Sequence, residues 1–343
     1  MRFGRAAASL LSFVTVSTPL GAQTVRIATF NAELSREGPG LMLRDIRAGD
    51  AQAAAVAEVI ALARPDVIAL QGIDWDLDGV ALSALAEAVA ERGLALPHRF
   101  AAQPNAGLAS GLDLDGDGRM GGPGDSQGYG AFTGQGGLAV LSRFPIGEVR
   151  DFSALLWTDL PGARLPVHAD GRPFPSAEAQ EVQRLSSTAH WVVPVMLPDG
   201  SRLDVLTFHA APPVFDGPED RNGLRNADEI ALWGHYLDGT LGGPASVPFV
   251  LAGDANLDPD RGEGRREVIR ALLADERVQD PLAGVDTVVW EGVGARRVDY
   301  VLPSAGLRVA GAGVVWPAPD EAGHAAALVA SRHRLVWVDV AAD

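Results

Sequence analysis

The sequence contains no cysteine, and positive charge is scarce in it. The first absence excludes disulfides, thiol catalysis and cysteine-ligated metals. The chain has 28 Lys and Arg residues against 44 Asp and Glu residues, which gives a formal net charge of −16. Such an excess of negative charge repels polyphosphates at long range and provides no overall basic surface for DNA. A nucleic-acid substrate would therefore need a local positive patch.

Long apolar runs are absent after the first 22 residues. Those residues, "MRFGRAAASLLSFVTVSTPLGA", place Arg2 and Arg5 before an apolar stretch that closes on the small residues Gly21 and Ala22. This layout is typical of a secretory signal peptide, and the stretch is too short and too interrupted by Ser and Thr for a membrane span. A frayed or buried first helix is the alternative. The sequence thus predicts an exported protein, periplasmic or secreted, without stable membrane insertion; without Arg2 and Arg5 its charge is 26 − 44 = −18.

Strand-like and helix-like segments alternate through the remaining chain. The hydrophobic patterns predict strands at 25–32, 65–71, 137–146, 189–197, 202–210 and 247–255, and further strands in the last third. They predict helices at 50–63, with Asp50 as N-cap, and at about 80–92. Some strands are joined by helices and others by short turns, which indicates a mixed α/β (α+β) protein with a mixed sheet or two packed sheets. With no repeat or linker in between, residues 23–343 are predicted to form one domain, and we expect a monomer.

A glycine-rich insertion interrupts this pattern at about 103–137, where 12 of 35 residues are glycine. Within it, Asp113, Asp115 and Asp117 take positions 1, 3 and 5 of a calcium loop, and Gly118 takes position 6. Position 12 is Gly124 instead of glutamate, so the segment is no EF-hand. It predicts a Ca²⁺ loop with a different closing ligand; a solvated acidic turn is the alternative.

Residues with catalytic chemistry gather at the ends of predicted strands. Asp254 and Asn256 follow a strand in "LAGDANLDP", and His209 ends another in "LTFHAAPP". A carboxylate there can hold a cation or deprotonate a water, and an amide can orient that water or donate to a phosphate oxygen. Asp299 in "RRVDYVLPS" and His333 in "ASRHRLVWVDV" also interrupt strand patterns. Taken singly, each of these residues is more often structural.

Together with "TFNAEL", "PDVIALQGID" and "GGLAVLSRFPI", these segments occur in an order that resembles the endonuclease/exonuclease/phosphatase superfamily, the deoxyribonuclease I-like fold. The resemblance covers essentially all of the chain after the predicted signal peptide. It implies a four-layer sandwich, in which two face-to-face mixed β-sheets are flanked by helices. It also implies a phosphoesterase site built from strand ends at one edge.

The resemblance further implies a role for each matching residue. Asn31 would anchor the metal and acidic cluster, and His209 would contact the phosphate. Asp254 and Asn256 would position the attacking water and the phosphate, and Asp299 would orient His333, which clamps the scissile phosphate.

The sequence departs from this family's pattern at two positions. Gly72 stands where the family has a metal-binding glutamate, and Arg332 replaces the aspartate of its Ser-Asp-His segment. The resemblance implies Mg²⁺ or Mn²⁺ bound with Asp254, but the loss of two carboxylates would weaken such binding severely. Asp74 and Asp76 are candidate replacement ligands, with turn and helix-cap roles as the alternative.

Three outcomes are open at this stage: rebuilt metal ligands, Arg332 in place of the metal, or a site that binds without cleaving. A guanidinium can supply the positive charge that a phosphoryl transition state needs. We expect an exported phosphoesterase that hydrolyses a phosphodiester or phosphomonoester; a catalytically impaired protein that binds a phosphorylated ligand is the alternative. The partner would be a small phosphorylated substrate or a nucleic acid. Arg221, Arg225 and Asn226, on a predicted helix at 219–237, either face this site or form a solvated helix face.

Overall fold

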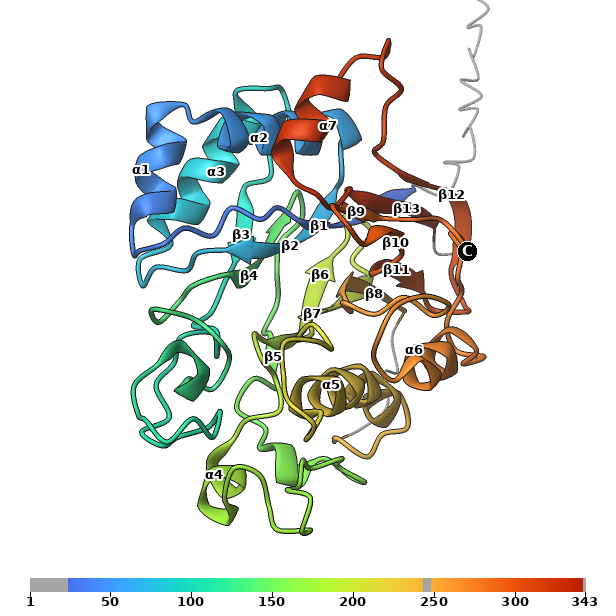
Figure 1. Cartoon of the computed structure of the whole chain (residues 1–343). Coiled ribbons are helices and arrows are strands. Elements are labelled where there is room, and N and C mark those ends of the chain that lie inside the picture. The colour runs from blue at the N-terminus through green and yellow to red at the C-terminus, as the bar shows by residue number, and fades with distance from the viewer. Residues whose placement is uncertain (1–23, 243–247, 342–343) are drawn as a thin grey trace, which may run out of the picture.

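The computed structural model describes residues 24–242 and 248–341, which form two large mixed β-sheets packed face to face (Figure 1). The predicted signal peptide, residues 1–22, lies outside the described residues. The first sheet runs in the order β12 (Arg308–Val314), β13 (Val336–Ala341), β1 (Val25–Asn31), β2 (Val67–Ile73), β4 (Gly137–Ser142) and β3 (His98–Phe100). The second runs in the order β11 (Asp299–Pro303), β8 (Phe249–Asp254), β7 (Arg202–His209), β6 (His190–Met196) and β5 (Arg150–Asp151).

Helices cover the outer face of each sheet. Figure 1 shows α1 (Leu41–Ala48), α2 (Ala51–Ala63), α3 (Val80–Ala90) and α7 (His324–Ala330) together on the first sheet. The second sheet carries α5 (Arg221–Leu237) and α6 (Arg266–Leu273). The remaining elements are α4 (Ala177–Val182), the 3₁₀ turns Pro123–Asp125 and Trp157–Asp159, and the hairpin β9 (Val288–Trp290) with β10 (Gly294–Arg296). The predicted four-layer sandwich is therefore confirmed.

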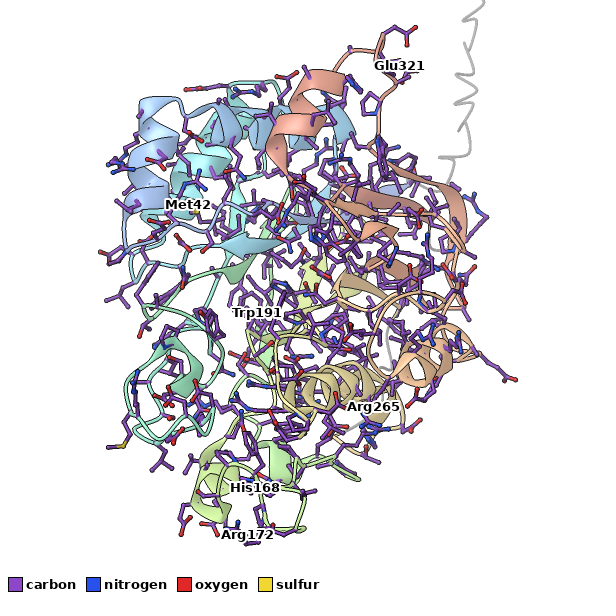
Figure 2. All side chains as sticks on the ribbon, viewed as in Figure 1. Met42, His168, Arg172, Trp191, Arg265 and Glu321 are labelled. Carbon is purple, nitrogen blue, oxygen red and sulfur yellow. The ribbon has the colours of Figure 1, made fainter. Side chains whose placement is uncertain are left out.

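The strand β2 shows why this architecture needs apolar residues on both faces of a strand. All seven of its residues are buried. Side chains alternate across a strand, so Val67 and Ala69 enter the core between the two sheets. Ile68 and Leu70 enter the core beneath the helices. Trp191, near the centre of the molecule in Figure 2, joins the sheets from the other side through an edge-on contact with Phe100, 4.9 Å between ring centroids.

Several local signals hold in the structure. The predicted N-cap Asp50 accepts hydrogen bonds from the backbone amides of Gln52 and Ala53 at the start of α2. The predicted final strand begins later than expected, at Val336, so His333 lies in the loop that precedes β13. In the described part of the chain, no helix is both long enough and apolar enough to cross a bilayer.

The topology brings several strand ends to one edge of the sandwich. Strand β7 runs parallel to β8, and their last residues, His209 and Asp254, are partners in the register. Strand β11 runs antiparallel to β8, so its first residue, Asp299, also lies opposite Asp254. Strand β1 runs parallel to β2 in the other sheet and ends at Asn31. Residues that are far apart in the sequence thus start from neighbouring backbone positions.

The position before Asp254 requires glycine because neighbouring backbone lies too close for a side chain. A Cβ at Gly253 would lie 2.4 Å from the carbonyl oxygen of Phe208 and 2.7 Å from that residue's Cδ1. We expect Gly253→Ala to lower the free energy of unfolding by about 1–3 kcal/mol, because adjacent strands must separate. The control is Gly234→Ala in α5, where a Cβ would meet nothing within 4 Å. This substitution should raise the free energy of unfolding by about 0.5–1 kcal/mol. Urea unfolding of both variants makes the comparison; equal effects would contradict this account.

Candidate active site

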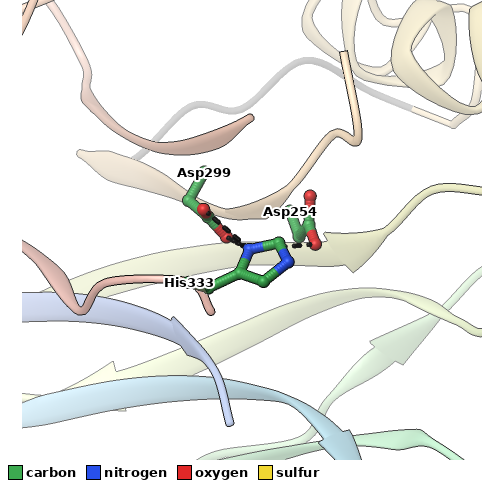
Figure 3. Close-up of side chains that lie close together, drawn as sticks. All are labelled: Asp254, Asp299 and His333. Carbon is green, nitrogen blue, oxygen red and sulfur yellow. Dashed lines mark hydrogen bonds and ion pairs between the residues drawn. The ribbon is translucent and has the colours of Figure 1, made fainter. Parts of the chain in front are cut away.

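Three buried side chains form the centre of the candidate site: Asp254, Asp299 and His333 (Figure 3). The Nδ1 atom of His333 lies 3.0 Å from Oδ2 and 3.1 Å from Oδ1 of Asp299, and 3.8 Å from Oδ2 of Asp254. The hydroxyl of Thr287 donates to Oδ2 of Asp299 at 2.8 Å. The imidazole is therefore held between two carboxylates, with its orientation set by Asp299.

Asp254 has further partners from three other segments. Its Oδ2 accepts a hydrogen bond from Nδ2 of Asn31 at 2.9 Å and lies 3.5 Å from Nε2 of His209. Its Oδ1 accepts a bond from the backbone amide of Asn256 at 2.7 Å, which closes a turn immediately after β8. Asn256 has a φ of 49°, so the extended backbone of β8, which ends at Asp254, does not continue to it. The Asn256 side chain donates to the carbonyl oxygen of Ala210.

These contacts give the neighbouring groups different protonation behaviour. Burial alone lowers the pKa of His333, but the charges of Asp299 and Asp254 outweigh it and raise that pKa to about 9. Burial raises the pKa of Asp254, and the charge of Asp299 raises it further. Burial also lowers the pKa of His209. The site thus combines one histidine of raised pKa, His333, one histidine of lowered pKa, His209, and a carboxyl group of raised pKa, Asp254.

Glu33, which the sequence analysis missed, lies beside this cluster. Its carboxylate accepts hydrogen bonds from the hydroxyl of Ser331 at 2.9 Å, the backbone amide of Arg332 at 2.8 Å and Nε of Arg332 at 2.8 Å, and it forms an ion pair with that guanidinium. Burial raises the pKa of Glu33, and the bonds from Arg332 more than compensate and lower it. The local signal for Glu33 was only its place two residues after Asn31.

The backbone of Glu33 also fills the space in front of Gly72. A Cβ at Gly72 would lie 2.8 Å from Oδ1 of Asn31 and 3.0 Å from the amide nitrogen of Glu33, and Gly72 has a φ of 69°. No other residue type fits here without displacing Glu33. The carboxylate that the family resemblance implies at position 72 is therefore absent, and a carboxylate from the end of β1 lies nearby instead.

The residues at the centre form a possible divalent-metal site, but it lacks the further carboxylates that the resemblance implied. Ligand atoms of Asp254, Asp299 and His333 lie within 4.8 Å of one another, a spacing that a metal could use. His333, however, already uses Nδ1 on Asp299, and a histidine ligand must give up its proton to the solvent before it binds a metal. Gly72 provides no ligand, and Glu33 is engaged by Arg332. The imidazolium of His333 and the guanidinium of Arg332 are the cations of this site.

The structure does not bring the two candidate replacement ligands into the cluster. The carboxylate of Asp74 accepts backbone hydrogen bonds from Arg36 and Gly136, which ties two loops together. The carboxylate of Asp76 accepts hydrogen bonds from the amides of Val80 and Ala81 in the first turn of α3. These contacts favour the turn and helix-cap interpretation of the segment over the ligand interpretation.

The acidic loop in the insertion lies apart from that cluster. Carboxylate oxygens of Asp113, Asp115 and Asp117 lie within 4.8 Å of one another. Those of Asp113 also accept backbone hydrogen bonds from Gly116 and Gly118. Asp125 is buried and holds the amides of Leu114 and Gly122 instead. The spacing is compatible with Ca²⁺, and calcium binding stays a prediction.

A cleft of about 800 Å³ leads away from His209, between the glycine-rich insertion and the start of α5. Of the three residues that the sequence suggested on α5, Arg225 donates to carbonyl oxygens of the segment 184–186 and of Gln127. Asn226 donates to the carbonyl oxygens of Ala211 and Ala255. These two residues hold the loops around the site. Arg225 and Arg221 both line the cleft.

The Asp299–His333 contact leads to a test by NMR. We expect the imidazole of His333 to titrate near pH 9 in the wild type, and its pKa to fall by at least about one unit in Asp299→Asn, because a neutral amide attracts the imidazolium less strongly. The folded-state pKa lies above the ordinary 6.5, so the pair stabilises the protein fully below pH 6.5 and loses that contribution as the pH rises through about 9. Nitrogen-15 spectra of the histidine rings measure both pKa values; an unchanged titration would refute the assignment.

Comparison with known proteins places this site in a wider group. The model of the Endonuclease/Exonuclease/phosphatase family matches residues 28–333. No curated protein matches the sequence. A Beutenbergia cavernae endonuclease/exonuclease/phosphatase has a similar structure, with a TM-score of 0.57, 19% identity, and coverage of 93% of this chain and 72% of that one.

Two further solved structures share the fold at similarly low sequence identity. The human Nocturnin catalytic domain has a TM-score of 0.52 and 14% identity, and 93% of each chain is covered. The sphingomyelinase C of Streptomyces griseocarneus has a TM-score of 0.50 and 18% identity, with 94% of this chain and 100% of that chain covered. At such low identity these likenesses show the fold alone. With the family match over nearly all of the described residues, they lead to one conclusion: this chain belongs to the endonuclease/exonuclease/phosphatase family.

Proposed function

We propose that this protein is an exported phosphoesterase that hydrolyses a phosphodiester or phosphomonoester at the site around Asp254. Members of the family are typically hydrolases that act on phosphoester bonds, and this group includes nucleases. The single observation that carries the proposal is the buried Asp254 carboxylate, which contacts His209 and Asn31 and lies 3.8 Å from Nδ1 of His333. Such an arrangement combines a base with donors for an anionic transition state.

In the proposed reaction, Asp254 accepts the proton of the attacking water. Its raised pKa makes it a better base than an exposed aspartate, and Asn31 and the amide of Asn256 hold it in place. Nδ1 of His333 is engaged by Asp299, so Nε2 is the ring atom left to donate to a phosphate oxygen. His209 supports the same anion from the neighbouring strand end. The resemblance implied the same roles for His209, Asp299 and His333, and for Asp254 the positioning of the attacking water.

We assign the positive charge opposite the phosphate to Arg332. Members of this family commonly use divalent metals, but here Gly72 provides no ligand and Nδ1 of His333 is engaged by Asp299. The Arg332 side chain is 65% exposed and uses Nε and one terminal nitrogen on Glu33, so it can still meet an anion. Glu33 fixes the guanidinium next to the loop that carries His333.

The central prediction concerns Asp254. We expect Asp254→Asn to lower kcat for bis-p-nitrophenyl phosphate at least about 100-fold, because the base is lost, and His333→Ala to lower it comparably. The matched control is Asp199→Asn, in an exposed turn, which should keep wild-type activity. Full activity in Asp254→Asn would overturn the proposal. Binding of phosphorylated ligands without turnover in the wild type would instead favour the binding-protein alternative.

Metal dependence gives a separate test. We expect hydrolysis to stay within about twofold of its starting rate in EDTA, and Arg332→Gln to raise KM about 10-fold or more, the loss expected for one charge-assisted contact. Rates with and without EDTA, Mg²⁺, Mn²⁺ or Ca²⁺ make the measurement, with Arg172→Gln on the exposed 168–172 turn as control. Activity that EDTA abolishes and Mg²⁺ restores would show that a metal is recruited and that the assignment to Arg332 is wrong.

A further inference from the structure

The cleft beside His209 contains a guanidinium without a partner. Arg221 lines this cleft, and its Nε is buried without a hydrogen bond. Within residues 24–242 and 248–341, no hydrogen bond or ion pair of its side chain is found. Burial lowers the pKa of Arg221. The negative charges of Asp115 and Glu219 offset this decrease only in part. Arg221 is half-buried, and a cation that is partly withdrawn from water without a partner favours an anionic ligand.

The neighbouring arginine shows the contrast. Arg225 lies one helical turn further along α5 and is fully engaged by backbone carbonyl oxygens. It therefore serves the structure of the loops, and its donors are not available to a ligand. Arg221 has the same side chain at the beginning of the same helix, yet it makes none of these contacts. The difference assigns the two arginines to different roles.

Two aromatic side chains line the same cleft and are largely exposed. Phe215, in the loop between β7 and α5, is 90% exposed, and Tyr129, in the glycine-rich insertion, is 79% exposed. Exposed aromatic rings of this kind can pack on a flat or apolar part of a ligand. The cleft therefore joins the candidate catalytic histidine His209, Arg221 and an aromatic entrance, and Asp115 of the insertion also belongs to its lining.

We propose that this cleft binds the non-reacting part of a small bis-anionic phosphoester, with Arg221 on a second phosphate group and Phe215 and Tyr129 against an apolar or aromatic moiety. This inference rests on the proposed function, because it takes His209 as the end of the cleft where the scissile phosphate lies. The volume of about 800 Å³ falls within the usual range for small-molecule sites. A nucleoside bisphosphate and the headgroup of a phosphorylated lipid share this chemistry.

A long nucleic acid fits these observations less well. Non-specific binding of a polynucleotide needs a row of available cations along the backbone track. Here one of the two arginines that line the cleft is committed to backbone carbonyls, and the chain has a net charge of −16. One free guanidinium in a cleft matches one additional phosphate. Binding of oligonucleotides in preference to bisphosphates would therefore count against the proposal.

The test is direct calorimetric binding to the full chain, which needs no turnover. The probes are adenosine 3′,5′-bisphosphate, adenosine 5′-monophosphate, a single-stranded DNA 12-mer and the soluble dioctanoyl phosphatidylinositol 4-phosphate, with the cell contents analysed for hydrolysis afterwards. We expect a bisphosphate-type ligand to bind about 10-fold or more tightly than the monophosphate, as expected for one charged contact. Arg221→Gln should remove that difference, whereas the exposed control Arg99→Gln should keep it.

Variants of the two aromatic residues distinguish a nucleotide ligand from a lipid ligand. In Phe215→Leu and Tyr129→Leu, a nucleotide should lose affinity because stacking is lost, whereas a lipid should retain it. Equal affinity for mono- and bisphosphates, an equal effect of Arg221→Gln on both, or tightest binding of the 12-mer would overturn the proposal. If the protein shows this binding pattern but does not hydrolyse p-nitrophenyl esters, the proposed function is refuted and the proposed ligand site is still supported.

Discussion

The buried carboxylate of Asp254 is the group on which the arrangement of the site depends. It is fully inaccessible to solvent, and a charge in that position needs compensation from hydrogen bonds and opposite charge. Asn31 donates from the first sheet, Asn256 from its own turn, and His209 and His333 approach from two other segments. The two sheets must therefore align at this edge, which gives the sandwich a polar link beside its apolar core.

The region around Gly72 shows a coordinated departure from what the family resemblance implies. Glycine at this position leaves room for the backbone of Glu33. Glu33 then meets Arg332, which itself stands where an aspartate was expected. Two expected carboxylates are thus replaced by one carboxylate and one cation that bind each other. The change in local charge is large, because carboxylates that suit a hard divalent cation are replaced by a carboxylate and a guanidinium that neutralise each other.

The proposed anion site is compatible with the acidic composition of the chain. The net charge acts over long distances and is screened by salt, whereas contacts inside a cleft act at short range in a lower dielectric. Arg221 and His209 line the cleft together with Asp115 of the insertion, and Arg332 is paired with Glu33 beside the cluster. The insertion thus provides both Tyr129 at the cleft and an acidic loop with the spacing of a cation site.

The sequence by itself determined the features that depend on neighbouring residues. Periodicity located the main strands and helices, and the cap at Asp50 and the strand ends at His209 and Asp254 could be identified because these signals extend over only a few residues. The pairing of Asp299 with His333 came from the family resemblance. Only the tertiary structure decided that Asp74 and Asp76 hold backbone amides, since an aspartate beside a turn has the same local pattern as a ligand or as a cap. Only it found Glu33, whose partner Arg332 is 299 residues away, because contacts between distant segments follow from packing and leave no periodic trace in the sequence.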